Sequence, residues 1–222
     1  MLKVVLFDLD GTLMDTAPEI ADALNSTLMR IGCPPVEPAL VRDWIGDGAR
    51  TLLQRALAHV QAPPLAAAQA WRCFEADYAY SCGSNSRVHD GVRPMLRRLR
   101  EQGVRIALLT NKEAVFAHRL LALHDLASEF DVIVAGDTLA VKKPHADMVN
   151  HVLQALGASA DEALLVGDSV TDVRTARNAG VAAWMVSHGY PQGELSGDDA
   201  PDGFIAHFDQ FKPQVCALVA IA

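Results

Sequence analysis

A chain of 222 residues is long enough to bury a full hydrophobic core, and it allows one domain or one domain with an insertion. Half of the residues are hydrophobic and 21% are charged, which is typical of a globular protein. The net charge of −8 argues against a broad basic surface for nucleic acid or anionic membrane, so an anionic ligand would need a local group of cations and backbone amides.

The chain begins with a run that predicts a buried strand over residues 2–8, because Val4 to Phe7 are apolar without alternation, as in a parallel sheet covered by helices. Asp8 and Asp10 follow, and they would face one spot if the extended geometry continues. Two carboxylates held that close repel each other unless a cation lies between them or one carries a proton. A surface turn would explain one acid and a glycine, but it does not require the second acid.

From about residue 15 to residue 89 the apolar residues recur at the helical spacing of i, i+3 and i+4. Four helices are expected, and Gly- and Pro-rich turns separate them at residues 32–35, 46–48 and 62–64. The aromatic residues of this block, Trp71, Phe74 and Tyr78, fit the core of a helical bundle better than a ligand cage.

After about residue 90, predicted strands alternate with predicted helices. The strands are expected at residues 105–109, 131–135, 163–166 and 182–186, and the helices at residues 92–102, 112–124, 145–157 and 170–179. This alternation is typical of a doubly wound, Rossmann-like α/β fold with a parallel sheet. The expected organisation is a core domain of residues 1–14 and 90–222 with an inserted all-α cap domain of residues 15–89.

The cysteines and the N-terminus favour the cytoplasm. Cys33, Cys73, Cys82 and Cys216 form no CxxC pair and are expected to be reduced thiols in apolar surroundings. Asp8 interrupts the N-terminal apolar run too early for a signal peptide, and no stretch approaches the roughly 20 apolar residues of a membrane span. We therefore expect a cytoplasmic protein with no membrane partner.

Polar residues gather where the predicted strands end. They are Asp8-Leu9-Asp10, Thr110-Asn111, and Gly167-Asp168-Ser169 followed by Asp172, and Lys142-Lys143-Pro144 stands just before a helix. Ligands of open α/β sheets bind beyond the carboxyl ends of the strands, so these residues are expected to meet.

The chemistry of these side chains points to phosphoryl transfer. Carboxylates of Asp8, Asp10 and Asp168 are hard oxygen ligands that suit Mg²⁺. The Thr110 hydroxyl, the Asn111 amide, a lysine and the backbone amides that follow Asp8, beginning with Leu9, can donate to a phosphoryl group. An aspartate can attack phosphorus and form an aspartyl-phosphate, although repulsion from the phosphate costs roughly 4 kcal/mol per charge pair at 4 Å. Mg²⁺ and a lysine would offset that repulsion.

These segments resemble a known family. The stretches Phe7–Leu13, Leu109–Asn111, Lys143-Pro144 and Gly167–Ser169 with Asp172 are similar to the four ordered motifs of the haloacid dehalogenase-like hydrolase superfamily. A helical insertion after the first motif resembles its subclass with an α-helical cap. The resemblance covers the whole chain and implies a doubly wound core with a cap over the active site.

The resemblance also implies residue roles. Asp8 would be the nucleophile, and Asp10 would protonate the leaving alkoxide and then activate water. Asp10 must then hold a proton while Asp8 does not, so their environments must differ. Thr110 and Asn111 would bind phosphate, and Lys143 would stabilise Asp8 and the transferring group.

For the metal, the resemblance implies that Asp8, the backbone carbonyl of Asp10 and Asp168 hold Mg²⁺. Asp172 would be either a ligand or a residue that orients the ligands.

The lysine of the third motif has two candidates, Lys142 and Lys143. Lys143 is favoured because it directly precedes Pro144, as in the family pattern. Ala146 stands where the family often has a second proline, which leaves the chemistry unchanged.

Within the superfamily, the stretches Trp44–Ala49, Gly136-Asp137 and Ser187–Tyr190 resemble phosphoglycolate phosphatases. The turn formed by Gly46, Asp47 and Gly48 is expected to open a helix and to act as a specificity loop, whose amides could meet a carboxylate. Arg50 is a second candidate partner, or a solvated arginine on the helix surface.

The function that the resemblance implies is a Mg²⁺-dependent phosphatase for a small phosphate monoester, converting 2-phosphoglycolate to glycolate and phosphate. The alternatives are a phosphomutase of the same cap subclass, a phosphatase for another sugar phosphate, and a catalytically silent protein on this fold. A monomer and a homodimer are both compatible with the sequence.

Overall fold

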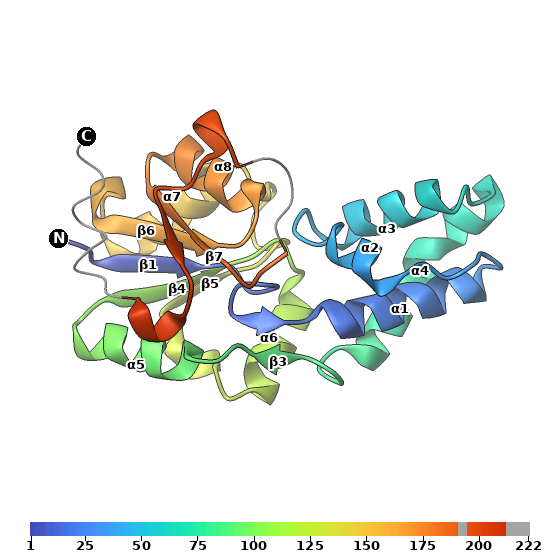
Figure 1. Ribbon diagram of the computed structural model, residues 1–222, viewed down its shortest axis with the longest axis horizontal. Coiled ribbons are helices and arrows are strands. Elements are labelled where there is room, and N and C mark those ends of the chain that lie inside the picture. The colour runs from blue at the N-terminus through green and yellow to red at the C-terminus, as the bar shows by residue number, and fades with distance from the viewer. Residues whose placement is uncertain (191–194, 212–222) are drawn as a thin grey trace.

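The computed structural model describes residues 1–190 and 195–211, and this part of the chain contains a six-stranded parallel sheet (Figure 1). The strand order is β5-β4-β1-β6-β7-β8. The strands are β1 Val4–Phe7, β4 Arg105–Leu109, β5 Val132–Val134, β6 Ala163–Gly167, β7 Ala182–Val186 and β8 Gly203–Ile205. β1 lies between β4 and β6, with Phe7 opposite Leu108 on one side and Val166 on the other. The predicted doubly wound α/β fold is confirmed.

Helices cover both faces of the sheet. They are α5 Val92–Glu101 and α6 Ala114–Leu123 on one face, and α7 Asp147–Leu156 and α8 Val170–Ala179 on the other (Figure 1). Val5 and Phe7 of β1 belong to the hydrophobic cluster of the first face, and Val4 and Leu6 to that of the second. Because both faces of β1 are buried, the strand is apolar at every position, which is the pattern that predicted a parallel sheet.

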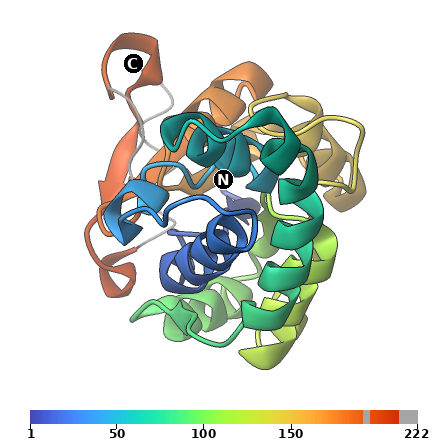
Figure 2. The same ribbon diagram turned by 90° about the vertical axis from the view of Figure 1, so that its right-hand side faces the viewer.

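Four further helices lie beyond the carboxyl end of the sheet: α1 Ala17–Arg30, α2 Pro38–Arg42, α3 Ala49–His59 and α4 Pro64–Ser81 (Figure 1). We call these helices and their connecting loops the cap. Figure 2 views the molecule from the cap side, so that the blue-to-teal helices lie in front of the sheet. Helix α1 packs along α4, as the helical spacing of their apolar residues predicts. The division into domains at residues 15 and 89 stays a prediction.

The two ends of the cap are joined by a short antiparallel ribbon that the sequence did not predict. It consists of β2, Met14–Asp15, and β3, Arg87–Val88, with Met14 paired to Val88 and Asp15 to Arg87. Two-residue strands show no alternation of apolar and polar residues, so no pattern could reveal them. The three-residue edge strand β8 was missed for the same reason.

Single turns of 3-10 helix complete the described part: η1 Ala127–Glu129, η2 Ala160–Glu162, η3 Gly197–Asp199 and η4 Phe208–Gln210. Cys33 and Cys82 are buried and Cys73 is half-buried, and all three are free thiols as expected. Cys216 lies outside the described residues. Among residues 1–190 and 195–211, no helix is both long and apolar enough to cross a membrane.

Candidate active site

The polar strand ends meet at one edge of the sheet. Asp8 follows β1, Thr110 follows β4 and Asp168 follows β6, and parallel neighbouring strands bring their carboxyl ends together. The Nζ of Lys143 lies 2.9 Å from Asp8 Oδ1 and donates a hydrogen bond of 2.7 Å to Asp172 Oδ1. The residues that the sequence grouped by their position after strands are therefore close in space.

Of the two candidate lysines, Lys143 is the one beside Asp8. Its side chain is 1% exposed, whereas that of Lys142 is 37% exposed and lies 3.6 Å from Glu113. Burial alone would lower the pKa of Lys143, but the carboxylates of Asp172 and Asp8 together hold that pKa above its usual value. Lys143 therefore keeps a positive charge inside the protein.

The carboxylates of Asp8, Asp168 and Asp172 form what we call the acid cluster, in which one oxygen of each lies within 4.8 Å of the others. Burial raises the pKa of Asp8 to about 6, and the charge of Asp172 adds to this rise while Lys143 opposes it. Burial also raises the pKa of Asp168 well above its usual value. Among the described residues, Asp8 Oδ1 has no hydrogen-bond partner of good geometry. Three buried carboxylates in mutual repulsion, with one lysine between two of them, fit a hard divalent cation.

Asp168 and Asp172 differ in the contacts that they already make. Asp168 accepts one hydrogen bond on each oxygen, from Thr12 Oγ1 at 3.0 Å and from Tyr190 N at 2.6 Å. Asp172 caps α8: its Oδ2 accepts from the backbone N of Ser169 at 3.1 Å and from the hydroxyl at 2.7 Å, while its Oδ1 binds Lys143. Asp172 is thus held in place by several donors and itself fixes Lys143.

The side chain of Asp10 lies apart from the acid cluster. It accepts a hydrogen bond of 2.6 Å from Thr16 Oγ1, and Lys112 Nζ donates to its two oxygens at 2.9 and 3.0 Å. Lys112 directly follows Thr110 and Asn111, but the sequence analysis gave it no role. Its place next to a polar strand end was a signal that could have found it.

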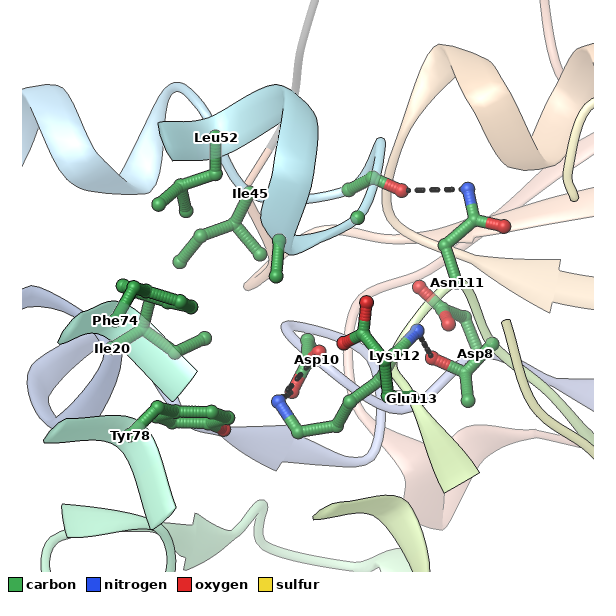
Figure 3. Close-up of a pocket in the computed structure, with 14 residues that line it drawn as sticks. Asp8, Asp10, Ile20, Ile45, Leu52, Phe74, Tyr78, Asn111, Lys112 and Glu113 are labelled. Carbon is green, nitrogen blue, oxygen red and sulfur yellow. Dashed lines mark hydrogen bonds and ion pairs between the residues drawn. The ribbon is translucent and has the colours of Figure 1, made fainter. Parts of the chain in front are cut away.

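A cavity of about 40 Å³ opens between the strand ends and the cap (Figure 3). Its wall on the cap side is mostly apolar and includes Ile20, Ile45, Leu52, Phe74 and Tyr78. Its floor is polar and includes Asp8, Asp10, Thr110, Asn111, Lys112 and Glu113. This volume holds only a few water molecules. Phe74 and Tyr78, two of the three aromatic residues expected in the core of the cap, thus also line the site.

The predicted specificity loop lies over this cavity, and α3 begins directly after it, as expected. Gly46 and Gly48 line the cavity, and Asn111 Nδ2 donates to Gly46 O at 3.0 Å and to Lys143 O at 3.2 Å. The loop is therefore hydrogen-bonded to the core in this structure. Asn111 also accepts from Lys143 N at 2.9 Å, so its side chain joins the loop to the lysine.

The other two predicted cap residues point elsewhere. Asp47 accepts a hydrogen bond of 2.8 Å from Thr171 Oγ1 at the start of α8 and lies 2.5 Å from Arg55 within the cap. The guanidinium of Arg50 stacks over the ring of Trp71, 3.9 Å from its centroid. The structure thus favours the interpretation of Arg50 as a surface arginine and makes Asp47 a contact between cap and core.

Tyr190 joins the site to the entrance of the cap, although the sequence gave it no individual role. Its hydroxyl accepts from the backbone N of Thr16 and of Ala17 at 2.9 and 3.1 Å, and donates to Asp15 at 2.5 Å. Its backbone N binds Asp168. A residue 174 positions from Thr16 in sequence cannot be linked to it by any local pattern.

Gly11 allows the chain to turn tightly beside the acid cluster. Its φ of +84° lies in the region that favours glycine, and a Cβ there would stand 2.2 Å from Asp168 Oδ2. Glycine is therefore required at this position of the first motif for two reasons: the φ angle is positive, and the carboxylate of Asp168, a candidate metal ligand, lies too close for a Cβ.

A doubly wound parallel sheet whose strand ends join carboxylates and a buried lysine under helices places the chain among the Rossmann-like α/β proteins. The sequence profile described as haloacid dehalogenase-like hydrolase matches residues 5–186. The chain belongs to this family.

Individual relatives and one solved structure are similar to this chain over most of its length. The chain is 40% identical to the phosphoglycolate phosphatase of Pseudomonas putida over 203 residues, which covers 90% of this chain and 74% of that one. It is 38% identical to the phosphoglycolate phosphatase of Yersinia pseudotuberculosis, covering 96% and 93% of the two chains. The crystal structure of a predicted phosphoglycolate phosphatase from Haemophilus somnus 129PT is similar in fold, with a TM-score of 0.88 at 30% identity and coverage of 93% and 95%.

Proposed function

We propose that this chain is a Mg²⁺-dependent phosphatase that hydrolyses 2-phosphoglycolate to glycolate and phosphate through an aspartyl-phosphate on Asp8. The family and the relatives that are phosphoglycolate phosphatases make the chain a phosphoric monoester hydrolase. The observation that carries the proposal of substrate, metal and intermediate is the placement of Asp8, Lys143 and the acid cluster next to one another at the floor of a small cavity.

Asp8 acts as the nucleophile in this proposal. A carboxylate oxygen of Asp8 forms a bond to phosphorus as the bond between phosphorus and the ester oxygen breaks. Lys143, 2.9 Å from Asp8 Oδ1, brings a positive charge against the negative charge of the incoming phosphate. The Thr110 hydroxyl, the Asn111 amide group and the backbone amide of Leu9 are proposed to donate to phosphoryl oxygens.

Asp10 moves the protons. It donates a proton to the ester oxygen as the alkoxide leaves, and it then takes a proton from the water that hydrolyses the aspartyl-phosphate. Its side chain lies outside the acid cluster and lines the cavity, so it is placed to meet the leaving group instead of the metal.

The acid cluster is proposed to hold Mg²⁺, with Asp8 and Asp168 as ligands together with the backbone carbonyl of Asp10. Asp172 is proposed mainly to orient Lys143 and the start of α8, since both of its oxygens already accept hydrogen bonds. When bound, the ion would supply positive charge against the phosphate and the carboxylates.

The small volume of the cavity favours a short ester. When Gly46 O is bonded to Asn111, the cavity of about 40 Å³ has room for only a few water molecules, so a short ester requires less opening of the cap than a long one. A sugar phosphate would require this loop to open.

The experiment is phosphate release from a panel of esters with Mg²⁺, combined with mass spectrometry of enzyme quenched during turnover. We expect the highest kcat/KM for 2-phosphoglycolate, a phosphate adduct on Asp8, and loss of activity with a chelator that Mg²⁺ restores. Asp8→Asn should abolish both turnover and the adduct, while Asp161→Asn, an exposed carboxylate at the far end of the sheet, should change neither.

Three outcomes would contradict the proposal. Release of no phosphate from any ester would exclude a phosphatase, and activity unchanged by the chelator would exclude the metal. Interconversion of a hexose phosphate with little free phosphate would favour the phosphomutase.

A further inference from the structure

Lys112 is a buried cation at the floor of the cavity. Its side chain is 4% exposed, and its ammonium binds both oxygens of Asp10 at 2.9 and 3.0 Å (Figure 3). The ring of Tyr78 lies on another side, with its centroid 4.8 Å from Nζ. The ammonium is thus held between the proposed general acid and the apolar wall of the cavity.

Lys112 is the only lysine or arginine among the described residues that line the cavity. The other charged residues of the lining have partners of their own: Asp8 lies beside Lys143, and Glu113 lies 3.6 Å from Lys142. The charge of Lys112 is balanced chiefly by Asp10. Glu19, a buried acid of α1, is the other carboxylate that attracts it.

The ammonium of Lys112 has three N–H donors, and in this structure it makes two contacts with Asp10, one to each carboxylate oxygen. Because Lys112 lines the cavity, a leaving group that carries its own carboxylate would find a donor there beside Asp10. In an ester of a 2-hydroxy acid, one carbon separates the ester oxygen from the carboxyl carbon, so a carboxylate lies close to the position where Asp10 meets the ester oxygen.

We propose that Lys112 is the specificity-determining residue that binds the carboxylate of the leaving group, and that the site selects phosphate esters of short 2-hydroxy acids for this reason. The inference rests on the proposed function, because it takes Asp10 as the general acid. It assigns carboxylate recognition to the core, at the end of β4, instead of to the amides of the loop Gly46–Gly48.

The test compares two substrates that differ in the carboxylate. Ethyl phosphate has the carbon skeleton of 2-phosphoglycolate without the carboxyl oxygens, and the ratio of the two kcat/KM values measures recognition of the carboxylate alone. We expect wild type to prefer 2-phosphoglycolate, and Lys112→Met to lower that preference by about 10- to 100-fold, as for loss of a hydrogen bond to a charged group. Lys112→Arg should keep part of the preference.

A matched control removes a neighbouring positive charge. Lys142→Met loses an ammonium that lies beside the cavity without lining it, and it should leave the ratio of the two kcat/KM values unchanged. Lys112→Gln, which retains a donor for Asp10 without the charge, is the second variant should Lys112→Met not fold, and it should also lower the ratio.

The outcomes separate the two proposals. If Lys112→Met or Lys112→Gln slows both esters equally and keeps the preference, Lys112 only positions Asp10 and the inference is wrong while the proposed function stands. If wild type itself hydrolyses both esters equally well, the proposed substrate is wrong. A fall of the ratio in Lys142→Met as large as in Lys112→Met would show a general charge effect and overturn the assignment to Lys112.

Discussion

Asp8 and Asp10 stand two residues apart, yet they have different surroundings. Asp8 faces Lys143 and the other two carboxylates of the acid cluster, and burial raises the pKa of Asp8 to about 6. Asp10 faces Thr16 and Lys112 and lies outside that cluster. The proposed role of nucleophile requires an ionised Asp8, so Lys143 and a bound Mg²⁺ would have to offset the effect of burial on its pKa.

Replacing Asp10 by Asn tests its proposed role. Asp10→Asn removes the group that carries the proton, so kcat for 2-phosphoglycolate should fall by about 10² to 10⁴. The affinity for Mg²⁺, measured by titration calorimetry, should stay close to that of wild type because the Asp10 side chain lies outside the acid cluster. Normal turnover by this variant would remove Asp10 from the mechanism, and lost Mg²⁺ binding would make its side chain a ligand.

At this scale, the sequence could predict the residues that meet but not all of their contacts. Asp8, Thr110 and Asp168 were predictable because each follows a strand, and strand ends of a parallel sheet converge. The ion pair between Lys112 and Asp10 depends on how β1 and β4 pair. Beyond the end of a strand, the sequence has no periodic pattern that would predict the direction of a side chain. The role of Arg50 was ambiguous from the sequence, because its stacking on Trp71 joins two cap helices whose packing the sequence does not give.

Among the elements, helix α8 and the loop before α3 are linked by a single hydrogen bond between side chains, from Thr171 Oγ1 to Asp47 Oδ1. Thr171→Val keeps the shape and removes this donor. If the bond holds the cap over the substrate, KM for 2-phosphoglycolate should rise by about 2- to 10-fold, the range for one hydrogen bond. Steady-state kinetics measures this change, and Thr171→Ser, which keeps the hydroxyl, is the matched control.

A melting temperature close to wild type would show that Thr171→Val acts on the closed cap and not on the fold. Should KM stay at the wild-type value, the bond would have no part in substrate binding. A rise of KM in Thr171→Ser as large as in Thr171→Val would place the effect in packing instead of in the hydroxyl.

Elements were predictable in proportion to their length. Helices of ten or more residues carry enough turns to show an apolar stripe, and α5 to α8 lie within the predicted ranges. The ribbon of β2 and β3 and the edge strand β8 are two or three residues long, so their pairing depends on contacts distant in sequence.

Over the whole molecule, a histidine pair lies where the cap joins the core. The rings of His89 and His188 are 4.1 Å apart, and His188 Nε2 binds Thr12 O at 3.1 Å. Burial, with the charge of His188 adding to it, lowers the pKa of His89 to about 4. The unfolded chain therefore binds more protons at this residue than the native protein between about pH 4 and 6.5, so His89 makes stability fall as pH is lowered through that window.

His89→Gln should reduce this acid sensitivity. The measurement is the free energy of unfolding in urea at pH 7 and pH 5 for wild type and variant. The variant should lose less stability between these values, because its side chain takes up no proton. Asp8, whose pKa is raised, acts in the opposite direction in both proteins and cancels in the comparison. Equal losses in the two proteins would contradict the assignment.

Three expectations at this scale stay predictions: the division into two domains, the location in the cytoplasm, and the choice between monomer and homodimer. The domain division depends on how the cap moves, and the other two depend on the surroundings of the chain. The family and five of the six strands of the sheet, by contrast, were predictable, because the four motifs and the alternation of strands and helices span most of the sequence.

The ribbon of β2 and β3 has a consequence for how such enzymes diversify. Because Met14 and Val88 are paired, the chain leaves and re-enters the core at neighbouring points, and the sheet is insensitive to the length of what lies between them. Evolution, or an engineer, can exchange the cap on these two strands as a cassette while the carboxylates and the lysine keep their positions. The size of substrate that the cap admits is then inherited separately from the chemistry and the carboxylate recognition proposed for the core.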